Sequence, residues 1–527
     1  MSRAAILDCT LRDGGYINEW QFGDKQIYGI ISRLVASGVD IIECGFLRDE
    51  AYEKGRSVFS CVSQIKPYIA PKKEGVQYVA MIALGDIAPE KLLPYDGGSI
   101  DGIRLTFHKH EWESAKKAAT QLMEKGYRVF VQPVGTTSYS DAELLQLIEE
   151  INLLQPFAFY LVDTLGILYR NELLRLFYLI DHNLAPQIKV GLHSHNNLQL
   201  SFSNAQELLR MNSRRDIILD ASVYGMGRGV GNLSTELIAE YINVNIGQKY
   251  SIMPLLSIAD QYLMSIYSEQ RWGYDLPYFL SAAEKCHPNY ASYLLKKETL
   301  NMEDISKILS LLPAGERDLY HSELIEEHYL TFQSCQIDDR GAVSSLAERL
   351  RGKNVLVLAP GAALHTHWRQ VQEYIGREKP LVIAVNFIPE EPVPDILFIS
   401  NRKRLDFLKG QICALPCVAA TSNLMEELPK SVYFVNYASY LGEGRAADNA
   451  GAMLIRLLRK AGAAKVALAG FDGFDADPYS NYCIGIYKSV LERDAAAQKN
   501  EDISRQLKLA LGGFPYEIVT PTRYQIE

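Results

Sequence analysis

The feature that most constrains this chain is an alternation of short apolar runs and longer amphipathic stretches over its first 245 or so residues. Segments with helical periodicity, such as DKQIYGIISRLVASG and SDAELLQLIEEINLLQ, separate runs that look like buried parallel strands. The eight runs are AAILDCT, VDIIECGF, VQYVAMIAL, GIRLTF, YRVFVQPV, FAFYLVD, IKVGLHS and DIILDASV. Eight strand-like runs in about 245 residues match a TIM (β/α)8 barrel, with a doubly wound open sheet as the alternative. Ser140, followed three residues later by Glu143, predicts a capping box at the start of one helix.

The rest of the chain changes pattern twice. From 246 to 349 the strand-like runs vanish and helical stretches take over. From 350 to 527 a second alternation begins, with the strand candidates VLVLAP, LVIAVN, DILFIS, CVAATS, VYFVNY and KVALAGF. We therefore expect an α/β barrel at 1–245, a helical extension at 246–349 and a smaller Rossmann-like α/β domain at 350–527.

Composition excludes several classes of function. A net charge of -9 and a pI near 5.7 argue against a nucleic-acid-binding surface. No apolar run approaches the roughly 20 residues that span a bilayer, and the N-terminus is interrupted by charge too soon for a signal peptide. We expect a cytoplasmic protein that forms a homo-oligomer and whose eight cysteines are free thiols.

Polar residues fall where the barrel strands are expected to end, which is the face on which TIM barrels act. Arg12, Asp13 and Tyr16 follow the first run, and the seventh run leads into His193 and His195. The other polar positions are Glu43 in the second run, Arg104 in the fourth, His108 after it, Asp163 at the end of the sixth and Asn232 after the eighth. One rim of the barrel thus collects the ionisable side chains.

Two His-x-His pairs occur, and their settings differ. On a strand, residues i and i+2 point to the same side, so His193 and His195 can aim at one ion, and Asp13 is the best third ligand. Two nitrogens and a carboxylate suit Mn²⁺, Mg²⁺, Fe²⁺ or Zn²⁺; the alternative is a pair of ordinary rim histidines. His365 and His367 lie at an expected helix start, where i and i+2 are about 200° apart and cannot share a ligand.

Three motifs in order resemble those of the DRE-TIM metallolyase family, to which HMG-CoA lyase belongs. They are Asp8-Cys-Thr-Leu-Arg12-Asp13-Gly14, His193-x-His195-Asn196 and the glycine-rich loop from Gly225 to Asn232. The resemblance covers the barrel, under half of the chain. It implies a divalent metal ion, Mn²⁺ or Mg²⁺ with Zn²⁺ as the alternative, held by the matching Asp and two His residues. It also implies that Arg12 polarises an enolate oxygen and that Asn232 supports or joins the ligands.

Within that family, LRDGGY looks closest to the 4-hydroxy-2-oxovalerate aldolase branch. That branch carries a histidine as acid/base where this chain has Tyr16. Tyrosine, with an ordinary pKa of about 10, is a weaker base, so we expect Tyr16 to protonate or hydrogen-bond a substrate oxygen. His108 and Tyr290 are the other acid/base candidates.

Three further residues have expected supporting roles. Glu43 and Asp163 are expected to orient Arg12 and its neighbours. Arg104 is expected either to bind a substrate carboxylate or to form an internal ion pair.

The leading interpretation is a metal-dependent aldolase or lyase acting on a pyruvate-type 2-oxo acid, with an aldehyde as the second partner. The alternatives are an acyl-CoA-dependent condensing enzyme and a non-catalytic scaffold barrel. In the last segment, VLVLAPGAAL and the pair Asp472 and Asp475 suggest a nucleotide site. The pattern also resembles that of nucleotide-sugar-using transferase domains, which implies a nucleotide-sugar as the ligand. The alternative there is a structural or oligomerisation domain.

Overall fold

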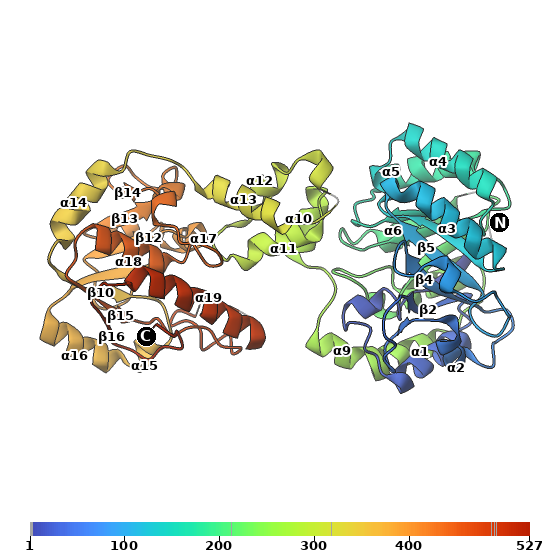
Figure 1. Cartoon of the computed structure of the whole chain (residues 1–527), viewed down its shortest axis with the longest axis horizontal. Helices are drawn as coiled ribbons and strands as arrows, with labels where there is room; N and C mark the ends of the chain where they lie inside the picture. Colours follow the sequence, from blue (N-terminus) through green and yellow to red (C-terminus); the bar gives the residue numbers. More distant parts are fainter. Residues whose placement is uncertain are drawn as a thin grey trace. The chain divides into compact units, whose positions relative to one another are not determined.

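The computed structural model describes residues 4–211, 213–317, 319–485, 487, 489, 491 and 493–526. The chain forms two compact units. The first unit is Met1–Ser292 with Pro313–Tyr320, and the second is Tyr293–Leu312 with His321–Glu527. Each contains one parallel sheet (Figure 1). Among the described residues, no helix is both long and apolar enough to cross a membrane.

The first unit is built on a closed barrel of eight parallel strands, which confirms the fold predicted from the apolar runs. Neighbouring strands pair in chain order, and β1 closes the ring by pairing with both β9 and β2. The barrel strands are β1 (Ala4–Asp8), β2 (Ile41–Leu47), β4 (Gln77–Ala83), β5 (Gly102–Phe107), β6 (Arg128–Pro133), β7 (Ala158–Asp163), β8 (Lys189–Ser194) and β9 (Ile217–Ala221). A two-residue strand, β3 (Val58–Phe59), pairs in parallel with the end of β2.

Helices surround this barrel and bury their apolar faces on it (Figure 1). They are α1 (Asp24–Ser37), α2 (Lys66–Ile69), α3 (Trp112–Glu124), α4 (Asp141–Leu154), α5 (Arg170–Asn183), α6 (Ser201–Arg210) and α7 (Thr235–Asn245). The predicted capping box is confirmed at α4, where Ser140 Oγ accepts from Glu143 N and the Glu143 carboxylate accepts from Ser140 N. Between β4 and β5 the described chain has only a 3₁₀ turn, Pro89–Lys91.

The inside of the barrel has an apolar layer below a charged one. Alternate strand residues point to the same face. Ile41 and Ile218 belong to the apolar cluster inside the ring, and Glu43 and Asp220 follow them two positions later, both almost fully buried. Because residues two positions apart face the same side of a strand, these carboxylates lie inside the barrel, nearer its carboxyl end than the apolar layer.

The region after α7 is helical, as predicted, and its residues contribute to both units. Its helices are α8 (Ile252–Ile258), a π-helical turn (Ala259–Leu263), α9 (Met264–Glu269), α10 (Leu276–Ala283), α11 (Pro288–Lys296), α12 (Met302–Ser310), α13 (Ser322–Gln333) and α14 (Arg340–Leu350).

The second unit contains a seven-stranded parallel sheet in the order β14-β13-β12-β11-β10-β15-β16. Its strands are β10 (Asn354–Leu358), β11 (Leu381–Val385), β12 (Ile396–Ile399), β13 (Val418–Thr421), β14 (Tyr433–Val435), β15 (Lys465–Ala469) and β16 (Tyr516–Ile518). Its remaining helices are α15 (Ala363–Thr366), α16 (Trp368–Glu378), α17 (Arg402–Leu408), α18 (Ala450–Lys460) and α19 (Arg493–Leu511).

Both faces of this second sheet are covered. Val355 and Val357 of β10 pack in one apolar cluster with residues of α18 and α19. Leu356 and Leu358 pack in another, with residues of α16 and α17. This alternation explains why the strands read as continuous apolar runs in the sequence.

Candidate metal site

Asp13, His193 and His195 meet at the carboxyl end of the barrel. Each offers one ligand atom, and the three atoms lie within 4.8 Å of one another. His193 is the fifth residue of β8 and His195 follows the strand, while Asp13 lies in the turn after β1. No other group of three or more potential metal-binding side chains is found in the part of the chain that the structure describes.

A buried carboxylate holds the first histidine. His193 Nδ1 lies 2.9 Å from Asp220 Oδ2, and Asp220 is almost fully buried. An imidazole that donates through Nδ1 has its lone pair on Nε2, and metal-binding histidines usually donate their other N–H to a carboxylate in this way. Asp220, which the sequence analysis did not single out, therefore holds His193 in an orientation suited to a metal ligand.

The glycine-rich loop brings Asn232 against the carboxylate of Asp13. Asn232 Nδ2 donates to Asp13 Oδ2 and, over 3.2 Å, to the carbonyl of Met226. A Cβ at Gly227 would lie 2.3 Å from Asn232 Nδ2 and 2.7 Å from Asp13 Oδ2. Only glycine at this position leaves room for the contact between the two side chains.

Arg12 is held by two carboxylates. Its Nε donates to Glu43 Oε2 over 2.8 Å and its Nη1 to Asp13 Oδ1 over 2.6 Å. The same Glu43 oxygen accepts from Arg104 Nη1 over 2.7 Å, and Arg104 Nη2 is paired with Asp220. Arg104 is 0% exposed, so the structure places it in an internal ion-pair network. This network joins Arg12 to the carboxylate that orients His193.

The charges of two of the three ligands suit a cation. Burial disfavours the charge of Asp13, but Arg12, His195 and His193 together hold the pKa of its carboxyl well below the usual range. Removal from water, reinforced by His193 and Arg12 and opposed by Asp13, lowers the pKa of His195 to about 4. At neutral pH Asp13 is therefore ionised and His195 is neutral, the forms that bind metals.

Two buried polar atoms beside Asp13 have no hydrogen-bond partner among the described residues. They are Arg12 Nη2 and Asn232 Oδ1. A buried polar atom without a partner costs free energy unless a ligand satisfies it. The amide oxygen fits a further metal ligand, and the N–H fits a donor to a substrate oxygen. The residues present thus match a divalent cation together with a substrate that carries oxygen atoms.

A chain of contacts links Tyr16, Arg228 and His287. Desolvation raises the pKa of Tyr16 above 10, so its hydroxyl can donate but not act as a base at neutral pH. The Arg228 guanidinium carbon is 5.9 Å from the centre of the Tyr16 ring. Its Nη2 lies 3.3 Å from His287 Nε2, while His287 Nδ1 accepts from Asn289 N.

The protonation state of His287 follows from its surroundings. Burial, together with Arg228, lowers the pKa of His287 to about 4, so the imidazole is neutral at pH 7. Because Nδ1 accepts a hydrogen bond, the proton of the neutral ring is on Nε2. The Arg228 and His287 nitrogens are only 3.3 Å apart, which is too close for an oxygen atom to lie between them. Sequence reasoning missed both residues, and the only signal was an arginine inside a run of glycines.

The remaining candidates from the sequence make other contacts. Asp163 accepts from the backbone N–H groups of Ile167 and Leu168, so its recorded bonds shape the loop after β7. His108 is exposed and caps a 3₁₀ turn, and the Tyr290 hydroxyl donates to the carbonyls of Glu316 and Leu319. Neither is among the three clustered ligands. His365 is exposed on α15.

Gly227→Ala is expected to weaken metal binding without unfolding the barrel. The added methyl group must displace Asn232 or Asp13, and loss of an outer contact to a metal ligand lowers affinity by about 10- to 100-fold. Titration with Mn²⁺ followed by calorimetry measures the change. Gly247→Ala is the matched control, because a Cβ there meets nothing within 4 Å. An unchanged affinity in the Gly227 variant would show that the contact is not needed.

Comparison with known proteins agrees with this geometry. The HMGL-like family model matches residues 106–260. The chain is 28% identical over 265 residues to 4-hydroxy-2-oxovalerate aldolase 2 of Salinispora arenicola, covering 48% of this chain and 73% of that protein. It is 25% identical over 248 residues to oxaloacetate decarboxylase of Mycobacterium tuberculosis, covering 44% and 68%.

A solved structure shows a similar extent of match. The N-terminal domain of a candidate aldolase from Bacteroides vulgatus is 25% identical, with a TM-score of 0.49, covering 55% of this chain and 96% of that one. All of these matches extend over about half of the chain. The family match and the aldolase relatives show that the barrel of this protein is similar to proteins of the HMGL-like (DRE-TIM) family.

Proposed function

We propose that the barrel is a divalent-metal-dependent aldolase or lyase that breaks or forms the C–C bond one carbon beyond the carbonyl group of a 2-oxo acid, by way of a pyruvate-type enolate. The observation that carries this proposal is the convergence of Asp13, His193 and His195 beside Arg12, whose Nη2 has no partner among the described residues. The relatives named as an aldolase and as a decarboxylase support a bond cleavage that leaves negative charge on the carbonyl oxygen.

The residues have distinct roles in this reaction. Asp13, His193 and His195 hold the cation, and Asn232 Oδ1 is suited to join them. When bound, Mn²⁺ or Mg²⁺, or Zn²⁺ as the alternative, supplies a Lewis acid for the oxygens of the 2-oxo acid. Arg12 Nη2 donates to the carbonyl oxygen, where negative charge develops as the bond breaks. In the bond-forming direction Tyr16, which is protonated, donates to the aldehyde oxygen as negative charge develops on it.

Deuterium exchange into pyruvate tests this proposal. Metal-free protein in D₂O should leave the methyl protons of pyruvate unexchanged, and added Mn²⁺ should raise the exchange rate by at least about 100-fold, the scale of one electrostatic contribution to catalysis. Proton NMR of the methyl signal measures the rate. Exchange that requires acetyl-CoA would instead indicate a condensing enzyme. No exchange by protein with stoichiometric metal would indicate a non-catalytic barrel.

Decarboxylation is the second candidate. Loss of CO₂ from an oxo diacid gives the same enolate as aldol cleavage, and the Arg228 guanidinium, next to Tyr16, carries N–H donors suited to a second carboxylate. The similarity to an oxaloacetate decarboxylase is consistent with this reaction. Pyruvate release from oxaloacetate, compared with pyruvate release from 4-hydroxy-2-oxovalerate, distinguishes the two activities.

For the rest of the chain we propose the division at 245 and 349 made from the sequence, with a Rossmann-like domain after residue 350. The reversal of strand order at β10 supports the latter, because dinucleotide-binding sheets reverse in the same manner.

A further inference from the structure

A pocket of about 920 Å³ lies in the second unit, at the carboxyl ends of β10, β11, β12 and β15. The residues that directly follow these strands line it, including Gly361, Asn386, Ser400 and Gly470. The strand order reverses at β10, which has β11 on one side and β15 on the other. Open parallel sheets bind their ligands at such a reversal, and the volume is typical of small-molecule sites.

Two guanidinium groups make this pocket attractive to an anion. Arg404 and Arg445 both line it, and neither has a recorded ion pair within the described residues. The lysines Lys297 and Lys499, which also line it, are each paired with a glutamate. Arg404 lies over the ring of Tyr487, 3.6 Å from its centre, and hydrogen-bonds the Tyr482 side chain. A guanidinium has five N–H donors, so others can meet a ligand.

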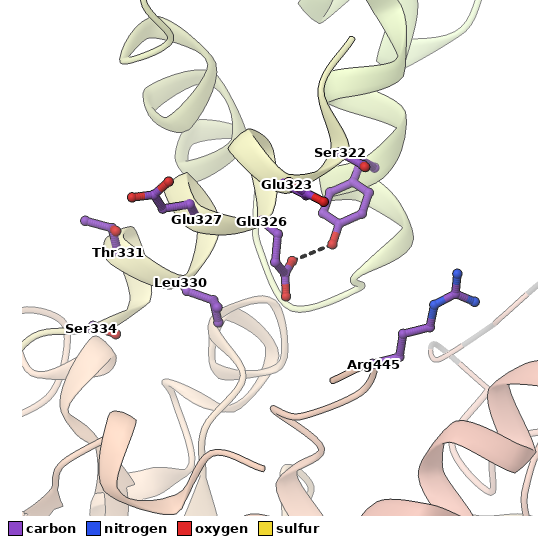
Figure 2. Close-up of a pocket in the computed structure, with 9 residues that line it drawn as sticks. Ser322, Glu323, Glu326, Glu327, Leu330, Thr331, Ser334 and Arg445 are labelled. Carbon is purple, nitrogen blue, oxygen red and sulfur yellow. Dashed lines mark hydrogen bonds between the residues drawn. The ribbon is translucent and has the colours of Figure 1, made fainter. Parts of the chain in front are cut away.

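The loop that carries Arg445 leads into the N-terminus of α18. This stretch, residues 441–451, contributes most of its residues to the pocket wall. Asn449 caps the helix by accepting from Ala452 N, and a helix start beside a guanidinium favours phosphate oxygens. Figure 2 draws a neighbouring acidic pocket that shares Arg445, and there the arginine lies apart from the glutamates Glu323, Glu326 and Glu327.

A second, independent feature is a buried carboxylate in the pocket wall. Asp472 is only 8% exposed. Its Oδ2 accepts from Ala363 N, but its Oδ1 is buried with no hydrogen-bond partner among the described residues. A Cβ at Gly361 would lie 2.5 Å from that oxygen, so glycine keeps the space beside it open. An acceptor of this kind is satisfied by a hydroxyl group of a ligand.

Aromatic side chains complete the pocket. Phe471, Phe474, Tyr482 and Tyr524 line it, and Phe474 and Tyr482 meet edge to face with ring centres 6.1 Å apart. Aromatic surfaces bind planar rings by stacking. The pocket therefore combines donors for an anion, an acceptor for a hydroxyl group and a surface for a flat ring.

We propose that the second unit binds a nucleoside phosphate in this pocket, with Arg404, Arg445 and the start of α18 on the phosphate groups. Asp472 accepts from a sugar hydroxyl, and the base packs on the aromatic side chains. The sequence suggested a nucleotide from Asp472 and the turn after β10; the two arginines, the unpaired oxygen and the aromatic wall come from the structure. The proposal does not depend on the activity of the barrel.

Titration calorimetry on the whole chain of 527 residues tests this proposal, with UDP, CDP, GDP and ADP as probes. At least one should bind with a Kd on the order of 10 to 100 µM, and pyrophosphate and the matching nucleoside should each bind at least about tenfold more weakly. Arg445→Ala and Asp472→Asn should each weaken binding about tenfold, the loss of one hydrogen bond to a charged group. Arg459→Ala, at the exposed end of α18, is the matched control and should bind as the unmodified chain does.

Three results would overturn the proposal. The first is that none of the four diphosphates binds below about 1 mM. The second is that pyrophosphate binds as tightly as any nucleotide, which would indicate an oxyanion site without base recognition. The third is that neither substitution weakens binding while circular dichroism shows both variants folded. A glucose ester of the best diphosphate is titrated in parallel, and tighter binding than the free diphosphate assigns a sugar nucleotide as the ligand.

Discussion

Arg12→Ala is expected to lower the rate of pyruvate deuterium exchange by about 10²- to 10³-fold while the metal stays bound, because removal of one preorganised donor to a developing oxyanion has this effect. Arg12 contributes no ligand atom to the metal cluster, and its Nη2 is the donor without a partner. NMR exchange rates and metal content, measured on the same samples, separate catalysis from metal binding.

The conservative variant makes this test specific. Arg12→Lys keeps a positive charge near Glu43 and Asp13 but loses the planar, multiple donation of the guanidinium. The Arg12→Lys variant should retain the fold and should still catalyse deuterium exchange into pyruvate, at a low rate. Arg12→Ala leaves Glu43 with one cationic partner instead of two, so its melting temperature must be compared as well. Exchange within about tenfold of the unmodified rate in a folded, metal-loaded Arg12→Ala protein would remove Arg12 from the mechanism.

His193→Ala is expected to abolish stoichiometric binding of Mn²⁺ and, with it, the exchange activity. The substitution removes one of only three clustered ligand atoms. Asp220→Asn should have a graded effect, with metal affinity lowered about 10- to 100-fold and activity recovered at high metal concentration, because Asp220 acts through His193. Metal analysis after dialysis and titration calorimetry measure the two variants.

The second His-x-His pair provides the control for this experiment. His365→Ala makes the same chemical change at an exposed position in the other unit and should leave metal content unchanged. Full metal content in a folded His193→Ala protein would contradict the ligand assignment. Metal loss in the His365 variant would show that the second pair also binds.

Strands could be predicted from the sequence where both of their faces are buried. Strands such as β10 and β15 are covered by helices on both faces and therefore read as unbroken apolar runs. The edge strand β16, whose three residues are all partly exposed, gave no such run and was missed. The short strand β3 was missed because two residues carry no periodicity.

The sequence predicted the residues of the candidate site only where the geometry of the strands determines their positions. His193 and His195 are two positions apart, so their side chains point to the same side of the strand. The position of Asp13 follows from the closure of the barrel. The role of Arg104 could not be decided, since its partners Glu43 and Asp220 are 61 and 116 positions away in the chain. Asp220 itself was hidden inside an apolar run, where a charged residue was the only sign of function.

The pairing of β1 with β9 also determines when the metal cluster can exist during biosynthesis. The Cys9 thiol donates a hydrogen bond to the carbonyl of Ala221, 212 positions later in the chain, and Asp13 accepts one from Asn232, 219 positions later. Contacts of such long range form late in folding, because a large loop must close first. A nascent chain that still holds residue 232 inside the ribosome cannot present the three ligands together. Uptake of the cation would therefore mark the completion of the ring in a newly made molecule, and not the formation of any single βα unit.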